Sequence, residues 1–368
     1  MAGLYVHLPF CKSRCLYCDF YSTTGMENRQ MEYVDAILHE YKLRQHFLNE
    51  KKIQTVYFGG GTPSILAPAL IKKMLDGFQV MPLECTIECN PDDITVDFVH
   101  NLVSSGVNRF SIGVQTFSDA RLKFLNRRHN SCQIYKAVDI LRNSGVDNIS
   151  IDLMFGFPDE TLAEWEKDID MALSMNVEHI SAYSLMYEEG TRLTSMLNNG
   201  CFNELDEETC LQMYEMLIDK LTLAGYEHYE ISNFAKHGFR SKHNSCYWNG
   251  TEYIGLGAAA HSYNGIVRQW NISNVDSYIR QVYKGVIPAE CEIIDETTKY
   301  NDTITTALRT CEGIAIDKLK QKFQTYLMDN ARRSLNAELL MITSDNHLKL
   351  TRKGLFVNNE VMTDLIWA

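Results

Sequence analysis

The chain has 368 residues, 45% of them hydrophobic and 22% charged, which is the composition of a globular protein long enough for one large domain and a smaller one. A formal net charge of −12 argues against non-specific nucleic-acid binding, because phosphate backbones are bound by basic surfaces. The sequence shows no signal-peptide pattern and no apolar run near the ~18 residues of a membrane span, so we expect a cytoplasmic protein.

Apolar segments rich in Val, Ile, Tyr and Phe alternate with helical patterns through the first two-thirds of the chain, which predicts parallel strands buried on both faces. The predicted strands are 4–8, 55–59, 85–89, 109–115, 149–155 and 179–185, and the predicted helices lie near 30–48, 64–78, 95–105, 131–144 and 161–175. Six such units predict an α/β fold, a partial (β/α)6 barrel of the TIM type, whose site lies at the C-terminal ends of the strands.

Local signals mark several helix ends. Thr161 and Glu164 fit a capping box, and Asp206 fits an N-cap for a helix reaching about residue 223. Gly106 and Gly145 each follow a predicted helix, where glycine adopts the left-handed conformation that turns the chain back.

The remaining third divides differently. Residues 226–290 are predicted to be irregular, and Pro288 marks a boundary between domains at 1–290 and 291–368. The tail predicts about three helices, a hairpin around Asp345 and Asn346, and a last short helix, as in a small winged-helix-like domain. Because its basic and acidic residues nearly balance, we do not expect it to bind DNA.

Three cysteines, Cys11, Cys15 and Cys18, follow the first predicted strand. Three thiolates can hold three irons of a [4Fe–4S] cluster and leave the fourth iron open for a ligand. The alternatives are weaker: zinc requires a fourth Cys or His nearby, a disulfide leaves one cysteine over, and a redox dithiol has no place for Cys11. The other eight cysteines are scattered and are predicted to be small buried apolar residues.

This C-x3-C-x2-C loop after a first strand resembles that of the radical S-adenosylmethionine (SAM) superfamily. The resemblance implies that the open iron binds the amino and carboxylate groups of SAM. It also implies that an electron from the cluster cleaves SAM to a 5′-deoxyadenosyl radical, and that the GGGTP turn at 59–63 binds the methionine amino group.

Polar residues interrupt the predicted strands at Glu88, Gln115 and Asp152. A buried polar group must find a partner, so each could be a satisfied core residue, but several on successive strands favour a shared ligand. SAM offers an ammonium, a carboxylate, a ribose diol and an adenine to such groups. Arg127 or Arg128 could meet its carboxylate.

The motifs Y-x-H-x-P-F-C-x3-C-x-Y-C, GGGTP, E-x-N-P, S-x-G-V-Q-T-F and I-D-L-M-F-G-F-P are together similar to one subfamily. It holds the oxygen-independent coproporphyrinogen III dehydrogenases (HemN) and the HemW haem chaperones, and the resemblance covers essentially the whole chain. By motif matching, the family's cluster and SAM positions fall on Tyr5, Cys11, Cys15, Tyr17, Cys18, Gly60, Gly61, Thr62, Glu88, Gln115, Arg127 and Asp152.

Three features favour the chaperone branch. The dehydrogenases carry a fourth cysteine where this chain has Phe20, and they carry an N-terminal extension, whereas only ten residues precede Cys11 here. The motif H-N-x-x-Y-W, which is associated with the chaperones, begins at His243. The resemblance therefore implies haem as cargo and recipient haemoproteins as partners. Peripheral contact with a membrane is compatible with this function. The alternative is a dehydrogenase making protoporphyrinogen IX by SAM-radical oxidative decarboxylation.

Haem binding needs an aromatic slot, an axial ligand and cations for the propionates. The aromatic-rich region 226–270 supplies such groups, with His243 predicted as the ligand and His228 as one rival. The other potential ligands are His237, Cys246 and His261, and the potential counter-charges are Lys236, Arg240 and Lys242.

Overall fold

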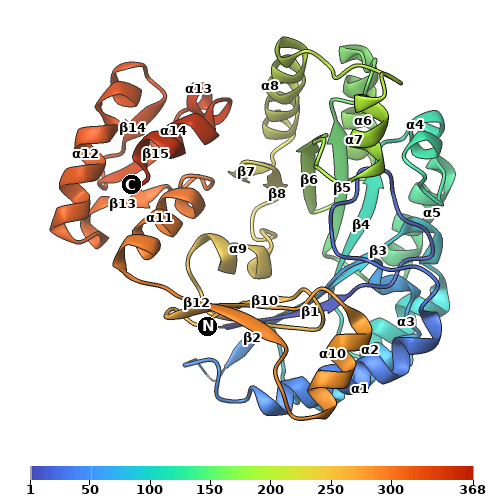
Figure 1. The fold of residues 1–368 in the computed structure, drawn as a ribbon. Coiled ribbons are helices and arrows are strands. Elements are labelled where there is room, and N and C mark those ends of the chain that lie inside the picture. The colour runs from blue at the N-terminus through green and yellow to red at the C-terminus, as the bar shows by residue number, and fades with distance from the viewer. Residues whose placement is uncertain (1, 51, 368) are drawn as a thin grey trace.

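The computed structural model describes residues 2–50 and 52–367, and a twelve-stranded sheet runs through its larger part (Figure 1). The strands follow one another across the sheet in the order β12-β11-β10-β9-β1-β2-β3-β4-β5-β6-β8-β7. Their bounds are β1 Ala2–Leu8, β2 Ile53–Gly60, β3 Glu84–Cys89, β4 Arg109–Gln115, β5 Ile149–Phe155, β6 His179–Ser184, β7 Glu227–Glu230, β8 Asn233–Ala235, β9 Tyr253–Leu256, β10 His261–Tyr263, β11 Val267–Asn271 and β12 Ala289–Ile293.

Strands β1 to β6 are mutually parallel, and the sheet forms a partial barrel that does not close. Strand β9 extends the parallel part by pairing with β1, and the strands beyond β9 and beyond β6 are antiparallel. The predicted fold class and all six predicted strands are confirmed. Because β1 to β6 share a direction, their C-terminal ends meet at one rim, as a site at that rim requires.

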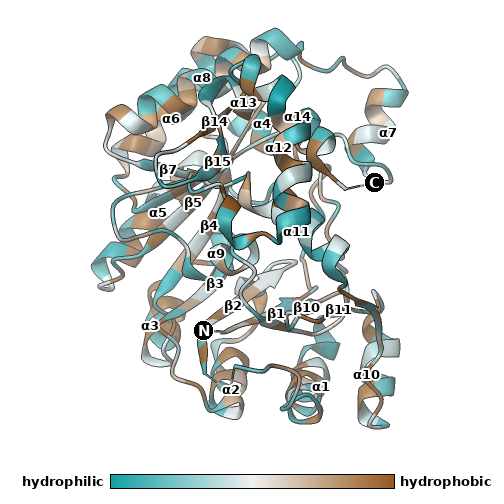
Figure 2. Ribbon diagram, turned by 90° about the vertical axis from the view of Figure 1, so that its left-hand side faces the viewer, coloured by the Kyte–Doolittle hydropathy of each residue, from teal (hydrophilic) through white to brown (hydrophobic). Residues whose placement is uncertain are grey.

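Helices cover the outer face of the sheet, and α2, α1 and α10 lie in a row along it (Figure 2). In the barrel part of the chain the α-helices are α1 Gln30–Leu43, α2 Pro68–Phe78, α3 Val96–Ser104, α4 Asp119–Phe124, α5 Ser131–Asn143, α6 Leu162–Ser174, α7 Arg192–Asn198, α8 Glu207–Leu223, α9 Lys242–Trp248 and α10 Val275–Tyr283. Short 3-10 turns are η1 Glu27–Arg29, η2 Pro63–Ile65 and η3 Pro91–Asp93.

Strand alternation separates the main core from the barrel interior. On β1, Leu4, Val6 and Leu8 are fully buried in the main core cluster with residues of the outer helices. Because successive side chains of a strand point to opposite faces, Tyr5 and His7 point into the barrel. The inward positions of the six strands therefore carry the polar residues that a ligand can meet.

The predicted helix ends are confirmed where a cap signal exists. Thr161 and Glu164 form a reciprocal capping box, and the side chain of Asp206 accepts the amide of Thr209. Gly106 and Gly145 have positive φ angles of 101° and 77°. The helix predicted over 30–48 ends earlier, at Leu43, and helices α4 and α7 were not predicted.

The prediction that residues 226–290 are irregular is wrong. Helices α9 and α10 and strands β7 to β11 lie there, and β12 begins at Ala289. The strands are only three to five residues long, too short for a local apolar run to reveal them.

The prediction for the isolated cysteines holds for some of them only. Cys85, Cys89 and Cys246 are buried, and Cys210 is half-buried. The exposed cysteines, for which the prediction is wrong, are Cys132, Cys201, Cys291 and Cys311.

The C-terminal part of the chain has its own apolar cluster, with members from Tyr300 to Leu365, and in Figure 1 it lies to one side of the sheet. Its elements are α11 Glu296–Ala307, β13 Ile314–Ala315, η4 Ile316–Lys318, α12 Gln321–Asn336, β14 Leu340–Ile342, β15 His347–Leu350, α13 Arg352–Leu355 and α14 Asn358–Leu365. The hairpin around Asn346 is confirmed. Strand β12 still pairs with β11, and the division of the chain at residue 290 stays a prediction.

Candidate functional site

The three cysteines of the C-x3-C-x2-C motif lie on the loop after β1, at the rim where the parallel strands end. Cys11 is buried, Cys15 and Cys18 are half-buried, and all three are free thiols. Leu16 fixes the loop, because its side chain is buried and its amide donates to the carbonyl of Leu125 at 3.1 Å. The chain therefore holds three thiols on one anchored loop.

The chemistry of these thiols fits an iron–sulfur cluster. Burial raises the pKa of Cys11 and of Cys18, and the neighbouring Cys15 raises both further. Ionised together they need a strongly cationic partner, which a metal centre supplies. Within 2–50 and 52–367, no three Cys, His, Asp or Glu side chains converge on one metal ion. A cubane cluster spreads its thiolates over separate irons, and this assignment stays a prediction.

The GGGTP turn lies directly against the cysteine loop. The amides of Gly61 and Thr62 donate, at 2.9 Å each, to carbonyls of the segment that leads into Cys11. A Cβ at Gly61 would lie 2.7 Å from the carbonyl carbon of Pro9, so only glycine fits. The hydroxyl of Thr62 donates to the sulfur of Cys11 at 3.4 Å, and Gly60 has a φ of +111°. The turn is thus a backbone cradle beside the thiols.

Two carboxylates lie on the inner face of the barrel, Glu88 on β3 and Asp152 on β5, with β4 between these strands. Glu88 accepts hydrogen bonds from the hydroxyl of Tyr57 at 2.8 Å and the amide of Gly60 at 3.1 Å. Asp152 accepts one from Ser111 at 3.4 Å. Burial raises the pKa of Glu88 to about 7 and that of Asp152 to about 6. A bound ammonium or diol would favour their ionised forms.

Gln115 ends β4 in an unusual conformation. Its φ of +66° lies in the left-handed region, and its side chain is buried. Its Oε1 atom has no hydrogen-bond partner in the described part of the chain. An unpaired buried acceptor costs ~1–3 kcal/mol, so a ligand that donates to it would be stabilised there. This orphaned oxygen fits a bound SAM.

Arg127, and not Arg128, is the arginine that faces the cysteines. Its Nη1 donates to the sulfur of Cys15 at 3.3 Å, and its Nη2 donates to the carbonyl of Gly113 at 2.7 Å. Arg128 instead forms ion pairs with the neighbouring acidic residues of η3. A guanidinium at this position can meet a ligand carboxylate next to the cysteines.

The two predicted tyrosines lie at different depths. Tyr17 is close to Cys15 and Arg127, and burial raises its pKa well above the usual value. Tyr5 lies within the barrel, where its hydroxyl and Nδ1 of His7 are 3.0 Å apart. The structure therefore gathers the predicted cluster and SAM residues at one rim, with Tyr5 behind them.

His243 lies apart from this rim and is fully buried. Its Nδ1 is 2.8 Å from the hydroxyl of Thr55, and its Nε2 is 2.9 Å from that of Tyr247. Burial lowers its pKa to about 3, so the ring is neutral. Because both ring nitrogens are engaged, helix α9 would have to move before His243 could bind iron, and its haem role stays a prediction.

Sequence reasoning missed two side chains that act on the carboxylates. Tyr57 bonds Glu88 directly, and Arg109, which is 1% exposed, lowers the pKa of Glu88 and Asp152 by its positive charge. Two nitrogens of Arg109 have no partner among residues 2–50 and 52–367. The available signal was strand alternation, because both residues occupy inward positions of predicted strands.

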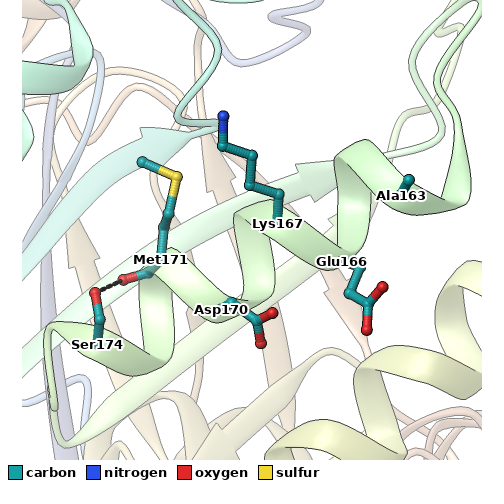
Figure 3. A pocket seen from close by; sticks show the side chains of 6 residues that line it. All are labelled: Ala163, Glu166, Lys167, Asp170, Met171 and Ser174. Atoms are coloured by element: carbon teal, nitrogen blue, oxygen red, sulfur yellow. Dashed lines mark hydrogen bonds between the residues drawn. The ribbon is translucent and has the colours of Figure 1, made fainter.

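A hollow of about 360 Å³ on the outer surface of α6 is separate from this site (Figure 3). All six of its side chains come from that one helix. Glu166 and Asp170 there are paired with Lys220 of α8, at 3.0 and 2.6 Å. The hollow therefore offers no group of unpaired side chains to a ligand.

Comparison with known proteins places this geometry in a family. Residues 5–172 match the model of the radical SAM superfamily. The chain is 33% identical over 371 residues to "Heme chaperone HemW" of Bacillus subtilis, covering 98% of both chains. The chain belongs to the HemW family. A second HemW, from Lactococcus lactis, is 32% identical, with 97% of this chain and 95% of the relative covered.

The fold of this HemW-family chain also matches a solved structure. Coproporphyrinogen III oxidase (HemN) of Escherichia coli superposes with a TM-score of 0.86 over 99% of this chain and 90% of that one. The two share 20% sequence identity, so the match establishes the fold alone. Within 2–50 and 52–367, no helix is long and apolar enough to cross a membrane.

Proposed function

We propose that the chain is a haem chaperone built on a radical SAM scaffold, which binds a [4Fe–4S] cluster, SAM and haem and delivers haem to haemoproteins. The observation that carries the proposal is the near full-length similarity to proteins named haem chaperones. We propose the cytoplasm as its location, with contact to the membrane surface where a recipient is membrane-bound.

The chain's own residues would divide the work at the rim. Cys11, Cys15 and Cys18 would hold the cluster, and the cradle of Gly60, Gly61 and Thr62 would bind the amino-acid part of SAM. Arg127, Tyr5 and Tyr17 would border its carboxylate and adenosine parts, and Gln115 would accept a hydrogen bond from it. Glu88 and Asp152 would accept hydrogen bonds from its ammonium or ribose hydroxyls. When bound, the cluster and SAM supply one-electron chemistry.

The competing function is the oxidative decarboxylation of coproporphyrinogen III. The likeness to HemN extends over the fold, but the position of the dehydrogenases' fourth cysteine is Phe20 here, whose side chain has no ionisable or redox group. We therefore propose that this activity is absent.

The two functions separate in one anaerobic experiment on the reconstituted full-length chain. Haem is titrated and then offered to excess apomyoglobin, while a parallel sample receives coproporphyrinogen III, SAM and a reductant. We expect stoichiometric haem binding, release to the acceptor and no protoporphyrinogen IX. Absence of haem binding, or repeated turnover of coproporphyrinogen III, would overturn the proposal.

A further inference from the structure

Arg109 is a buried cation on the inner face of the barrel. It begins β4, and because side chains alternate along a strand, its neighbour Phe110 points into the main core while Arg109 points inward. Its side chain is 1% exposed, and its Nε and Nη1 atoms form no hydrogen bond within residues 2–50 and 52–367. A guanidinium that clamps a fold donates to neighbouring oxygens from its several N–H groups. Arg109 is not such a clamp, so what it brings to the barrel interior is its charge.

This charge lies close to both carboxylates that are proposed to bind SAM. Ser111, the next inward residue of β4, pairs in register with Glu88, and its hydroxyl donates to Asp152 at 3.4 Å. Two residues along one strand and one strand across separate Cα atoms by about 8 Å, a gap that a long arginine side chain can span. Arg109 is thus a diagonal neighbour of Glu88, and it lies two residues from the serine that bonds Asp152.

The charge of Arg109 matters most for Asp152. Burial raises the pKa of Asp152 to about 6, and the positive charge of Arg109 is the strongest of the influences that lower it. Hydrogen bonds with Ser181 and Ser111 and the charge of Arg127 lower the same pKa less. Without Arg109, Asp152 would keep its proton to a higher pH. A protonated carboxyl is a poorer partner for an ammonium or a diol than a carboxylate is.

The other titratable groups of the interior are neutral. His179 of β6 and His243 of α9 face Arg109, and burial lowers the pKa of both, so neither ring carries a charge. Burial and nearby carboxylates raise the pKa of the hydroxyls and the thiol around Glu88 and Asp152, which therefore stay protonated. These groups belong to Tyr5, Tyr57, Cys89, Tyr183, Tyr229 and Tyr247. Among all of these neighbours, Arg109 alone is a cation.

We propose that Arg109 is a positioning residue for SAM, a buried counter-charge that keeps Asp152, and to a smaller extent Glu88, ionised for the ligand. The proposal rests on the proposed function, because it concerns the SAM that the chain is already proposed to bind. Both carboxylates are half-buried, whereas Arg109 is fully buried, so Arg109 acts through them. A cation in direct contact with SAM would repel its ammonium, and one that stays buried leaves the carboxylate oxygens free for the ligand.

The test is a calorimetric SAM titration of the anaerobically reconstituted full-length chain between pH 6 and 9. Each affinity is expressed relative to the wild type at the same pH, which cancels the titration of the amino group of SAM. A nearby cation lowers a carboxyl pKa by about 1–3 units, so Arg109→Met, which removes the charge, should bind SAM roughly fivefold or more weakly at pH 6. The deficit should shrink to within about twofold at pH 9, where the carboxylates are ionised without help.

Two further variants separate charge from shape. Arg109→Lys keeps the positive charge and loses the planar guanidinium, so it should bind SAM within about threefold of the wild type at every pH. Arg142→Met is the matched control, because it removes a guanidinium of α5 that bonds Glu178 at 2.8 Å, and it should behave as the wild type. Iron content, measured beside each titration, shows that the variants carry equal amounts of cluster.

A second comparison applies even if Arg109→Met does not fold. Asp152→Asn and the double variant Arg109→Met/Asp152→Asn, which loses both opposite charges, should bind SAM within about threefold of each other at pH 6, because Arg109 acts mainly through Asp152. A further loss in the double variant, a deficit of Arg109→Met that is equal at pH 6 and 9, or an Arg109→Lys variant as weak as Arg109→Met would overturn the proposal. If the wild type binds no SAM at any pH, the proposed function fails instead.

Discussion

The hydroxyl of Tyr57 donates a 2.8 Å hydrogen bond to the carboxylate of Glu88. The same ring packs against His243 with 5.1 Å between ring centroids. His243, the first residue of the H-N-x-x-Y-W motif, therefore contacts the same tyrosine that bonds Glu88, a proposed SAM ligand. If Glu88 binds SAM as proposed, Tyr57 is a positioning residue, since it would act on SAM through Glu88.

Replacing Tyr57 by Phe removes that bond from a buried carboxylate. The pKa of Glu88 is already raised to about 7 by burial, and the Tyr57 bond lowers it, so the variant should have a higher pKa. If SAM needs ionised Glu88, wild-type affinity should rise as the pH increases through about 7. Loss of a bond to a charged group, about 1.5–3 kcal/mol, should move this midpoint upward by roughly one to two pH units.

Calorimetric SAM titrations between pH 6 and 9 check this prediction. Tyr41→Phe is a matched control, because it removes a tyrosine hydroxyl of α1 that donates to the backbone carbonyl of Phe78 in α2. A midpoint that is the same in Tyr57→Phe and the wild type would show that Tyr57 only packs.

Glu88 should also make folding stability depend on pH. Its folded pKa of about 7 exceeds the unfolded value, so the folded state binds more protons between about pH 4.5 and 7. Stability is therefore lost as the pH rises through this window. At pH 8 the free energy of unfolding of Glu88→Gln should exceed that of the wild type by up to about 3 kcal/mol. The difference should vanish near pH 4.

Urea unfolding in the absence of SAM measures this difference, with exposed Glu360→Gln as the control. Equal stabilities at pH 8 would mean that water or a counter-charge solvates Glu88 in solution. A stability gain combined with weaker SAM binding would show that the carboxylate is kept for its ligand.

The cysteine assignment predicts a clear division among variants. Ala at position 11, 15 or 18 should abolish or severely impair assembly of a cluster of about four irons, because each thiolate holds one iron. Cys132→Ala and Cys201→Ala, at exposed positions, should keep the wild-type iron content. Iron analysis after anaerobic reconstitution decides this, and wild-type iron content in the three motif variants would contradict it.

The carboxylates should affect SAM and not iron. Asp152→Ala and Glu88→Ala each remove an acceptor of ligand hydrogen bonds, which costs ~1–3 kcal/mol and so roughly 5- to 150-fold in SAM affinity. Iron content should stay at the wild-type level. SAM affinity within about twofold of the wild type, and of the exposed control Asp139→Ala, would identify both as ordinary core hydrogen-bonding groups.

The parallel strands could be predicted from the sequence because their signal lies within each strand. Strands buried on both faces are apolar runs, and their polar exceptions, Glu88 and Asp152, lie inside the barrel as expected. The edge strands could not be predicted, because β9 to β12 are only three to five residues long and β9 pairs with the distant strand β1. Tyr57 was missed because an aromatic on an apolar strand resembles core. The burial of His243 depends on which face of a seven-residue helix turns inward, which its short sequence does not fix.

The last prediction concerns Phe20, which takes the place of the dehydrogenases' fourth cysteine. Its side chain is 65% exposed and can only pack. Three thiolates suffice for a cluster with an open iron, so SAM should bind to the wild type.

Coproporphyrinogen III, however, carries four carboxylates that need cations, and two of the cations beside the cysteine loop are already paired with carboxylates. Lys12 bonds Asp93 at 3.0 Å, and Arg128 bonds Asp92 and Asp93 at 2.9 and 2.7 Å. We therefore expect no conversion by the wild type and none by Phe20→Cys, because one added thiol supplies no positive charge. Chromatography with porphyrin fluorescence after oxidation of the products measures this. Protoporphyrin IX formed over many turnovers by either protein would show that the paired cations do not prevent substrate binding.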